Sequence, residues 1–177
     1  MTVYAFFADI LDYPEHSIAN SIGECAAELT VQAPDAYSEI MDFHTAVAQQ
    51  NLGQLQEFYT NAFDLRPDCT PNLGYHLFGD DGRRGLFLVE LKERMEARGM
   101  QFGVELPDHI ALILRYLDLA EDERPFVIED CLLPAVSRMA EVLNHSGNPY
   151  EHVLRALLSL LRRQHEAFVV SAVEVNA

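Results

Sequence analysis

The chain has 177 residues, 49% of them hydrophobic, which is sufficient for one globular domain with a substantial core. Its formal net charge is -16, and residues 1–65 hold ten acidic residues and no Lys or Arg. Because this charge repels phosphate backbones and anionic lipids, we expect no nucleic-acid partner and no membrane insertion. No run approaches about 18 uncharged apolar residues, and the N-terminus lacks the basic start of a secretory signal, so we expect a cytoplasmic location.

Apolar residues recur at intervals of three and four through the first 62 residues, which is the spacing of an amphipathic helix. The pattern predicts one helix over residues 3–10 that ends before Pro14, and further helices with apolar stripes over 18–29, 37–44 and 55–62. The expected core face of the third helix is Tyr37, Ile40, Met41 and His44.

Residues 64–85 differ from this pattern, since prolines, glycines and helix-capping residues interrupt the apolar repeat. We expect a loop there that contains one short helical turn over residues 73–78. A long helix should follow, with Gly99 as its C-cap, and residues 100–107 should form a second loop or hinge.

The C-terminal part is also helical in its periodicity. Ile110 to Leu117 carries one apolar stripe, and Pro107 suits the first turn of that helix. Pro134 falls inside the next stripe, which predicts a kink or a later helix start. After a last clear helix over residues 154–161, we expect the tail at 168–177 to be frayed helix or disordered. The sequence thus predicts an all-α fold, a single helical bundle over residues 1–177 with about eight to ten helices.

No motif for catalysis, cofactor binding or metal binding is evident. The glycine-rich turn at 79–85 follows no predicted strand and lacks the lysine of a phosphate-binding loop. No Cys-x-x-Cys or Glu-x-x-His pair occurs, and the histidines share no spacing. We therefore expect no catalytic residue, no cofactor and no metal. Of the three cysteines, Cys25 and Cys131 fit apolar positions on helices and should be plain buried thiols.

Two segments could form a peptide-binding groove. One is Glu105-Leu106-Pro107-Asp108-His109, which would place carboxylates and an imidazole at a helix start. The other supplies large apolar residues around a loop, namely Leu73, Tyr75, Leu77 and Phe78. An apolar floor with an acidic edge fits a cationic amphipathic helix. The alternative is purely structural: Asp108 caps a helix, His109 lies near the surface, Leu77 and Phe78 plug the loop onto the core, and the acidity only aids solubility.

The order of several short motifs over residues 55–120 resembles the NarJ-type family, the delta-subunit assembly chaperones of respiratory nitrate reductase, and its TorD and DmsD relatives. These motifs are Tyr59-x-x-x-Phe63-Asp64-Leu65, Leu77-Phe78-Gly79, Arg83-Arg84-Gly85, and Glu105-Leu106-Pro107-Asp108-His109 leading into Leu114-x-x-Leu117. This chain departs from many TorD-type members in having Tyr75 and no Trp upstream of the Leu-Phe pair.

The resemblance implies an all-helical, cytoplasmic and non-catalytic protein. Such a chaperone binds the N-terminal leader of the apo catalytic subunit of a molybdenum oxidoreductase, and supports cofactor insertion before membrane docking or export. It implies Leu77 and Phe78 in the peptide groove, with Glu105, Asp108 and His109 as the hinge-side motif. Molybdenum-cofactor biosynthesis proteins are further implied partners.

Two other functions stay open on sequence alone. One is a helical metal-dependent hydrolase that uses Asp108, His109 and distant histidines. The other is an acidic helical adaptor unrelated to molybdenum enzymes.

Overall fold

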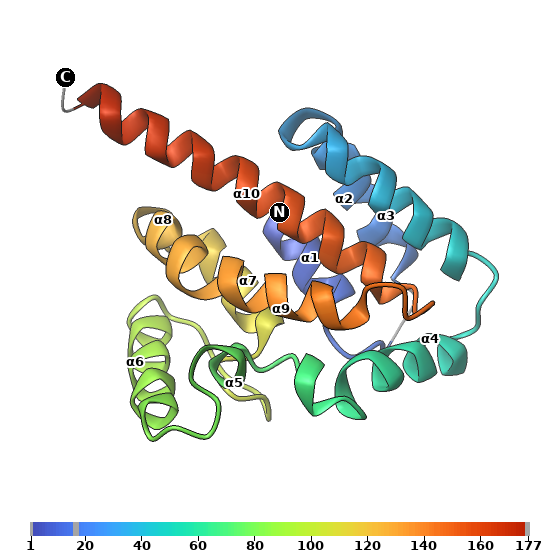
Figure 1. Cartoon of the computed structure of the whole chain (residues 1–177), viewed down its shortest axis with the longest axis horizontal. Coiled ribbons are helices and arrows are strands. Elements are labelled where there is room, and N and C mark those ends of the chain that lie inside the picture. The colour runs from blue at the N-terminus through green and yellow to red at the C-terminus, as the bar shows by residue number, and fades with distance from the viewer. Residues whose placement is uncertain (1, 16–17, 176–177) are drawn as a thin grey trace.

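A computed structural model of the chain describes residues 2–15 and 18–175, and for residues 172–175 only the backbone. The described part is helical, with no strand (Figure 1). This confirms the expected all-α fold. The α-helices are α1 (Val3–Ile10), α2 (Ala19–Gln32), α3 (Pro34–Val47), α4 (Leu52–Tyr59), α5 (Leu73–Phe78), α6 (Arg83–Ala97), α7 (Ile110–Leu119), α8 (Arg124–Val127), α9 (Leu133–Leu143) and α10 (Tyr150–Val175). Short 3-10 segments lie at Pro67–Cys69 and Glu121–Glu123, and π-helical segments at Thr60–Asp64 and Ile128–Leu132.

The long helix α10 forms one wall of the bundle. It packs against α3 and α9, while α1 packs against α2 and α7 (Figure 1). Large side chains at these contacts are almost completely buried, among them Phe7, Phe43, Tyr116 and Tyr150. By contrast, α6 packs mainly against α5, and its only buried residues are Leu91 and Met95. Helix α6 therefore contributes little to the buried core, and ion pairs from Arg94 and Arg98 to Glu123 hold its C-terminal end to the bundle.

The helix boundaries follow from local chemistry. Asn51 and Gln54 form a reciprocal capping box at the start of α4. Gly99 has a φ of +80°, the left-handed conformation that ends a helix, which confirms the expected end of α6. Pro134 lies in the first turn of α9 directly after a π-helical segment. Proline has no N–H to donate to a carbonyl in the preceding turn, so it is tolerated in the first turn of a helix. Its position in α9 confirms the later helix start.

Two expectations differ from the structure. The buried face of α3 is Ala36, Ile40, Phe43 and Val47, whereas Tyr37 is 38% exposed, so the predicted stripe was wrong by part of a turn. The cause is a tertiary contact, because the Phe43 ring packs 5.3 Å from the Tyr150 ring. Helix α7 begins at Ile110 rather than at Pro107. In the tail, α10 continues as helix through Val175, and residues 176–177 lie outside the described part.

Candidate functional site

Two segments that the sequence singled out lie side by side. The Leu73 N–H donates to the Asp108 carbonyl at 2.8 Å, and the Ile110 N–H donates to the Pro71 carbonyl at 2.8 Å. These bonds form an antiparallel bridge at Asn72 and His109. The bridge starts α5 and α7 at the same place, and explains why α7 cannot begin at the proline three residues earlier.

Asp108 is enclosed behind this bridge. Its side chain is completely buried, and Oδ2 accepts from the Gly74 N–H at 3.1 Å and from Arg84 at 3.4 Å. A Cβ at Gly74 would lie 2.7 Å from Oδ2, so only glycine permits this approach. Burial raises the pKa of the Asp108 carboxyl, although the Arg84 charge opposes the shift. Asp108 does act as a cap, but it caps α5 instead of its own helix.

His109 faces the other side of the bridge. Its side chain caps α7, since Nδ1 accepts from the Ala111 N–H at 3.3 Å. We therefore assign the proton to Nε2, which makes a long contact of 3.5 Å with the Tyr59 hydroxyl. His109 is 3% exposed, and this burial lowers its pKa, so the imidazole is neutral at pH 7.

A continuous acidic groove runs past His109 and Glu105. It consists of two cavities of about 520 and 450 Å³ that share Asp12, Tyr13 and Glu105. Its lining residues with charged or apolar side chains include Asp9, Asp12, Tyr13, Glu15, Ile18, Tyr59, Phe63, Asp64, Val104, Glu105, Leu112 and Arg115. The groove is formed by the end of α1, the start of α2, the loop before α7 with the first turns of α7, and the segment from α4 to α5.

Charge and shape in the acidic groove favour a cationic ligand with an apolar side. The only Lys or Arg among its lining residues is Arg115, which is already paired with Asp9 at 3.1 Å and with Asp12 at 2.9 Å. Glu105 has no ion-pair partner in the described part of the chain. Val104 is 97% exposed and Tyr13 45% exposed, so both can be covered by a bound molecule.

The structure divides the predicted peptide-binding residues into two groups. Glu105 and His109 line the acidic groove. Leu73 is completely buried in the core, and Leu77 packs against the core while partly exposed. Neither cavity of the groove is lined by Tyr75, Leu77 or Phe78.

The two partly buried aromatic residues of α5 contact α6. The Phe78 ring lies 5.3 Å from the Phe87 ring, with the Arg83 guanidinium 5.7 Å from the Phe78 centroid. The Arg84 guanidinium lies 6.0 Å from the Tyr75 centroid. The basic pair thus orients α6 on α5, and its second member also holds Asp108.

Sequence reasoning missed several residues of the groove, namely Asp12, Tyr13, Tyr59 and Asp64. Their signal was weak but present, since the N-terminal third contains acids and no bases. Nothing in the sequence showed that the end of α1 meets the loop before α7.

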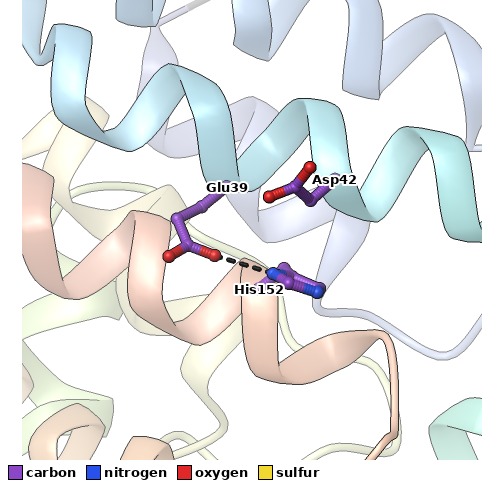
Figure 2. Close-up of side chains that lie close together, drawn as sticks. All are labelled: Glu39, Asp42 and His152. Atoms are coloured by element: carbon purple, nitrogen blue, oxygen red, sulfur yellow. Dashed lines mark hydrogen bonds and ion pairs between the residues drawn. The ribbon is translucent and has the colours of Figure 1, made fainter.

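The described residues contain little that suits catalysis. All three cysteines are buried and free, which confirms the prediction of buried thiols at Cys25 and Cys131, and burial raises the pKa of each thiol to about 12. Among the described residues, one group of three possible metal ligands lies close together, and it contains neither Asp108 nor His109. That group is Glu39, Asp42 and His152 (Figure 2). His16 lies outside the described residues.

Comparison with known proteins identifies the family. No helix in the described part is long and apolar enough to cross a membrane. Residues 26–164 match the family model described as nitrate reductase delta subunit. A relative from Bacillus subtilis (strain 168), "Probable nitrate reductase molybdenum cofactor assembly chaperone NarJ", is 27% identical over 124 residues, which cover 70% of this chain and 67% of the relative. The chain therefore belongs to the nitrate reductase delta-subunit family, the NarJ-type chaperones that its motifs resemble.

Proposed function

We propose that this protein is a non-catalytic cytoplasmic assembly chaperone for a molybdenum oxidoreductase, with respiratory nitrate reductase as its client. It binds the N-terminal leader of the apo catalytic subunit and keeps that subunit available for cofactor insertion before membrane docking or export. Proteins of molybdenum-cofactor biosynthesis then act on the chaperone–client complex. Family membership and the name of the Bacillus relative support this role.

The acidic groove is the observation that carries the proposed binding mode. Five carboxylates line it, those of Asp9, Asp12, Glu15, Asp64 and Glu105, against the single Arg115. An amphipathic leader helix with Lys or Arg on one face would place its cations against these carboxylates. Its apolar face would cover exposed apolar side chains such as Tyr13 and Val104.

Affinity and orientation come from different parts of the groove. An exposed ion pair contributes only about 0–1 kcal/mol, so the apolar contacts must supply most of the binding free energy. The carboxylates chiefly raise the encounter rate and fix the direction of the leader. The site residues accordingly have different roles in this proposal. Glu105 and His109 contact the leader, while Asp108 and Leu73 position the backbone beneath them.

Tyr75, Leu77 and Phe78 make a second proposed contact, to the apolar part of a leader that extends beyond the acidic groove. Leu77 and Phe78 are both partly exposed, which allows such a contact. Since these residues do not line the groove, Phe78→Ala separates the two contacts. A leader truncated to its cationic half should bind the Phe78→Ala variant and the wild-type protein equally.

Calorimetry with a synthetic leader of the nitrate reductase catalytic subunit tests the proposal. Glu105→Gln should weaken binding by about two- to fivefold, the range of one exposed ion pair. The matched control is Glu93→Gln, which removes an exposed α6 carboxylate outside the groove and should leave affinity unchanged. Absence of heat with the leader, or equal weakening by both variants, would contradict the groove as the binding site.

A further inference from the structure

A second cluster of polar side chains lies between α3 and α10, apart from the residues of the acidic groove. Glu39 and Asp42 project from α3 one turn apart, and His152 projects from the first turn of α10 (Figure 2). Each offers one possible ligand atom, and these three atoms all lie within 4.8 Å of one another. One imidazole and two carboxylates thus converge from two helices that are distant in sequence.

The backbone beneath this cluster is held firmly. Ile40 and Phe43, the neighbours of the two acids on α3, are completely buried. Tyr150 and Val153, which flank the histidine on α10, are also completely buried, and the Phe43 and Tyr150 rings pack 5.3 Å apart. Packing therefore fixes the three Cα positions before any ligand binds, which lowers the entropy that a ligand must remove.

Charge around the cluster is incompletely balanced. His152 Nδ1 and Glu39 Oε2 share a hydrogen bond of 2.7 Å, while Asp42 has no hydrogen-bond or ion-pair partner in the described part of the chain. The nearest cation is Arg155, whose guanidinium lies 4.0 Å from Glu39. That guanidinium also binds Asn144 at 2.7 Å and Glu151 at 3.3 Å, so Glu39 is only its most distant partner.

The ligand types match a first-row divalent cation. Zn²⁺ binds imidazole nitrogen at about 2.0–2.1 Å and carboxylate oxygen at about 2.0–2.2 Å, usually with four ligands. Such bonds require neighbouring ligand atoms to lie about 3–3.5 Å apart. Glu39 is partly exposed and Asp42 is exposed, so both side chains have room to rotate toward this spacing. The imidazole would bind the cation through a ring nitrogen that carries no proton, any proton on that nitrogen passing to the other ring nitrogen or to water, and water would complete the coordination.

We propose that Glu39, Asp42 and His152 form a binding site for a divalent transition-metal cation of the zinc class, and that this cation ties α3 to α10. The cation binds the folded bundle and has no such site in the unfolded chain, so it stabilises the fold by mass action. Because it stands outside the acidic groove, this site acts independently of leader binding.

Zinc titration of the full-length protein, freed of metal by a chelator, tests the site. Calorimetry should show one equivalent of Zn²⁺ bound, and saturating zinc should raise the Tm by about 5 °C. His152→Gln and Asp42→Asn should each lower zinc affinity at least tenfold. Asp42 is exposed and forms no hydrogen bond or ion pair in the described part of the chain, so its variant tests the ligand role without disturbing the helix contact.

The matched control is His165→Gln, which removes a partly exposed histidine from the same helix but outside the cluster. It should leave zinc affinity and the zinc-dependent Tm shift unchanged. Cobalt(II) substituted for zinc reports direct coordination through its visible absorption, which His152→Gln should abolish. Substoichiometric zinc binding, or equal loss of affinity in the His165 and His152 variants, would overturn the proposal.

Discussion

Replacement of Asp108 separates a structural role from direct contact with a ligand. In Asp108→Ala the Gly74 N–H loses its acceptor, and the half-buried Arg84 loses its carboxylate partner. An unsatisfied buried donor costs about 1–3 kcal/mol. Some of this cost is offset, because the substitution also removes Oδ1 of Asp108, a buried oxygen that has no hydrogen-bond partner. We therefore expect Asp108→Ala to lower the free energy of unfolding by about 2 kcal/mol.

Asp108→Asn provides the contrast. An amide oxygen can still accept from the Gly74 N–H, and the change removes a buried charge whose partner Arg84 reaches water. Asp108→Asn should therefore lower the free energy of unfolding by less than about 1 kcal/mol. Urea unfolding followed by circular dichroism measures both variants, with equal m-values as the check that only stability has changed.

Peptide calorimetry on the Asp108→Asn protein completes the test. Because the Asp108 side chain is completely enclosed, this variant should bind the leader as the wild-type protein does. A stable Asp108→Asn protein with leader affinity reduced tenfold would refute the reasoning, since Asp108 would then contact the ligand. Equal destabilisation by Ala and Asn would refute the assignment of the Gly74 bond as the main contribution.

Three further predictions follow from the same contacts. Gly74→Ala should destabilise the fold by about 1–3 kcal/mol, because the new Cβ would meet Asp108 and Phe87. Gly85→Ala, on the open side of α6, should instead stabilise the fold by about 0.5–1 kcal/mol. Thermal unfolding of the two variants measures both effects. Burial lowers the pKa of His109, so the contribution of this residue to the free energy of unfolding should be complete above about pH 6.5. Below that pH the free energy of unfolding should fall by up to about 1.4 kcal/mol per pH unit. Urea unfolding of His109→Asn, which keeps an acceptor for the helix cap, should show a smaller dependence on pH. Leader affinity should fall between about 0.05 and 0.5 M salt, and an unchanged Kd would contradict the role of the carboxylates.

The sequence was sufficient where local signals act alone. Helical periodicity gave the all-α fold, and the interrupted pattern at 64–85 correctly located the short helix that became α5. Gly99 and Pro134 marked helix boundaries because each depends on backbone chemistry of a single residue. Such signals need no knowledge of which elements meet.

Tertiary contacts account for what the sequence did not reveal. The buried face of α3 depends on the contact between Phe43 and Tyr150, which are 107 positions apart. The start of α7 depends on backbone bonds to the residues before α5. Likewise, Glu39 and Asp42 are an ordinary pair of acids until the fold brings His152 beside them from 113 positions away.

The hydrogen bonds between residues 71–73 and 108–110 have a consequence for motion. They join the two ends of a chain excursion that contains α5, α6 and the loop at 98–109, and this excursion also meets the bundle through α5 on α9 and through ion pairs of Arg94 and Arg98 with Glu123. We expect this unit to open cooperatively, because both bonds, the buried Leu73 and these ion pairs must be released together. The same bridge carries His109 on one side and Asp108 on the other, so a leader bound at His109 in the proposed groove would act on the backbone that also holds the start of α5.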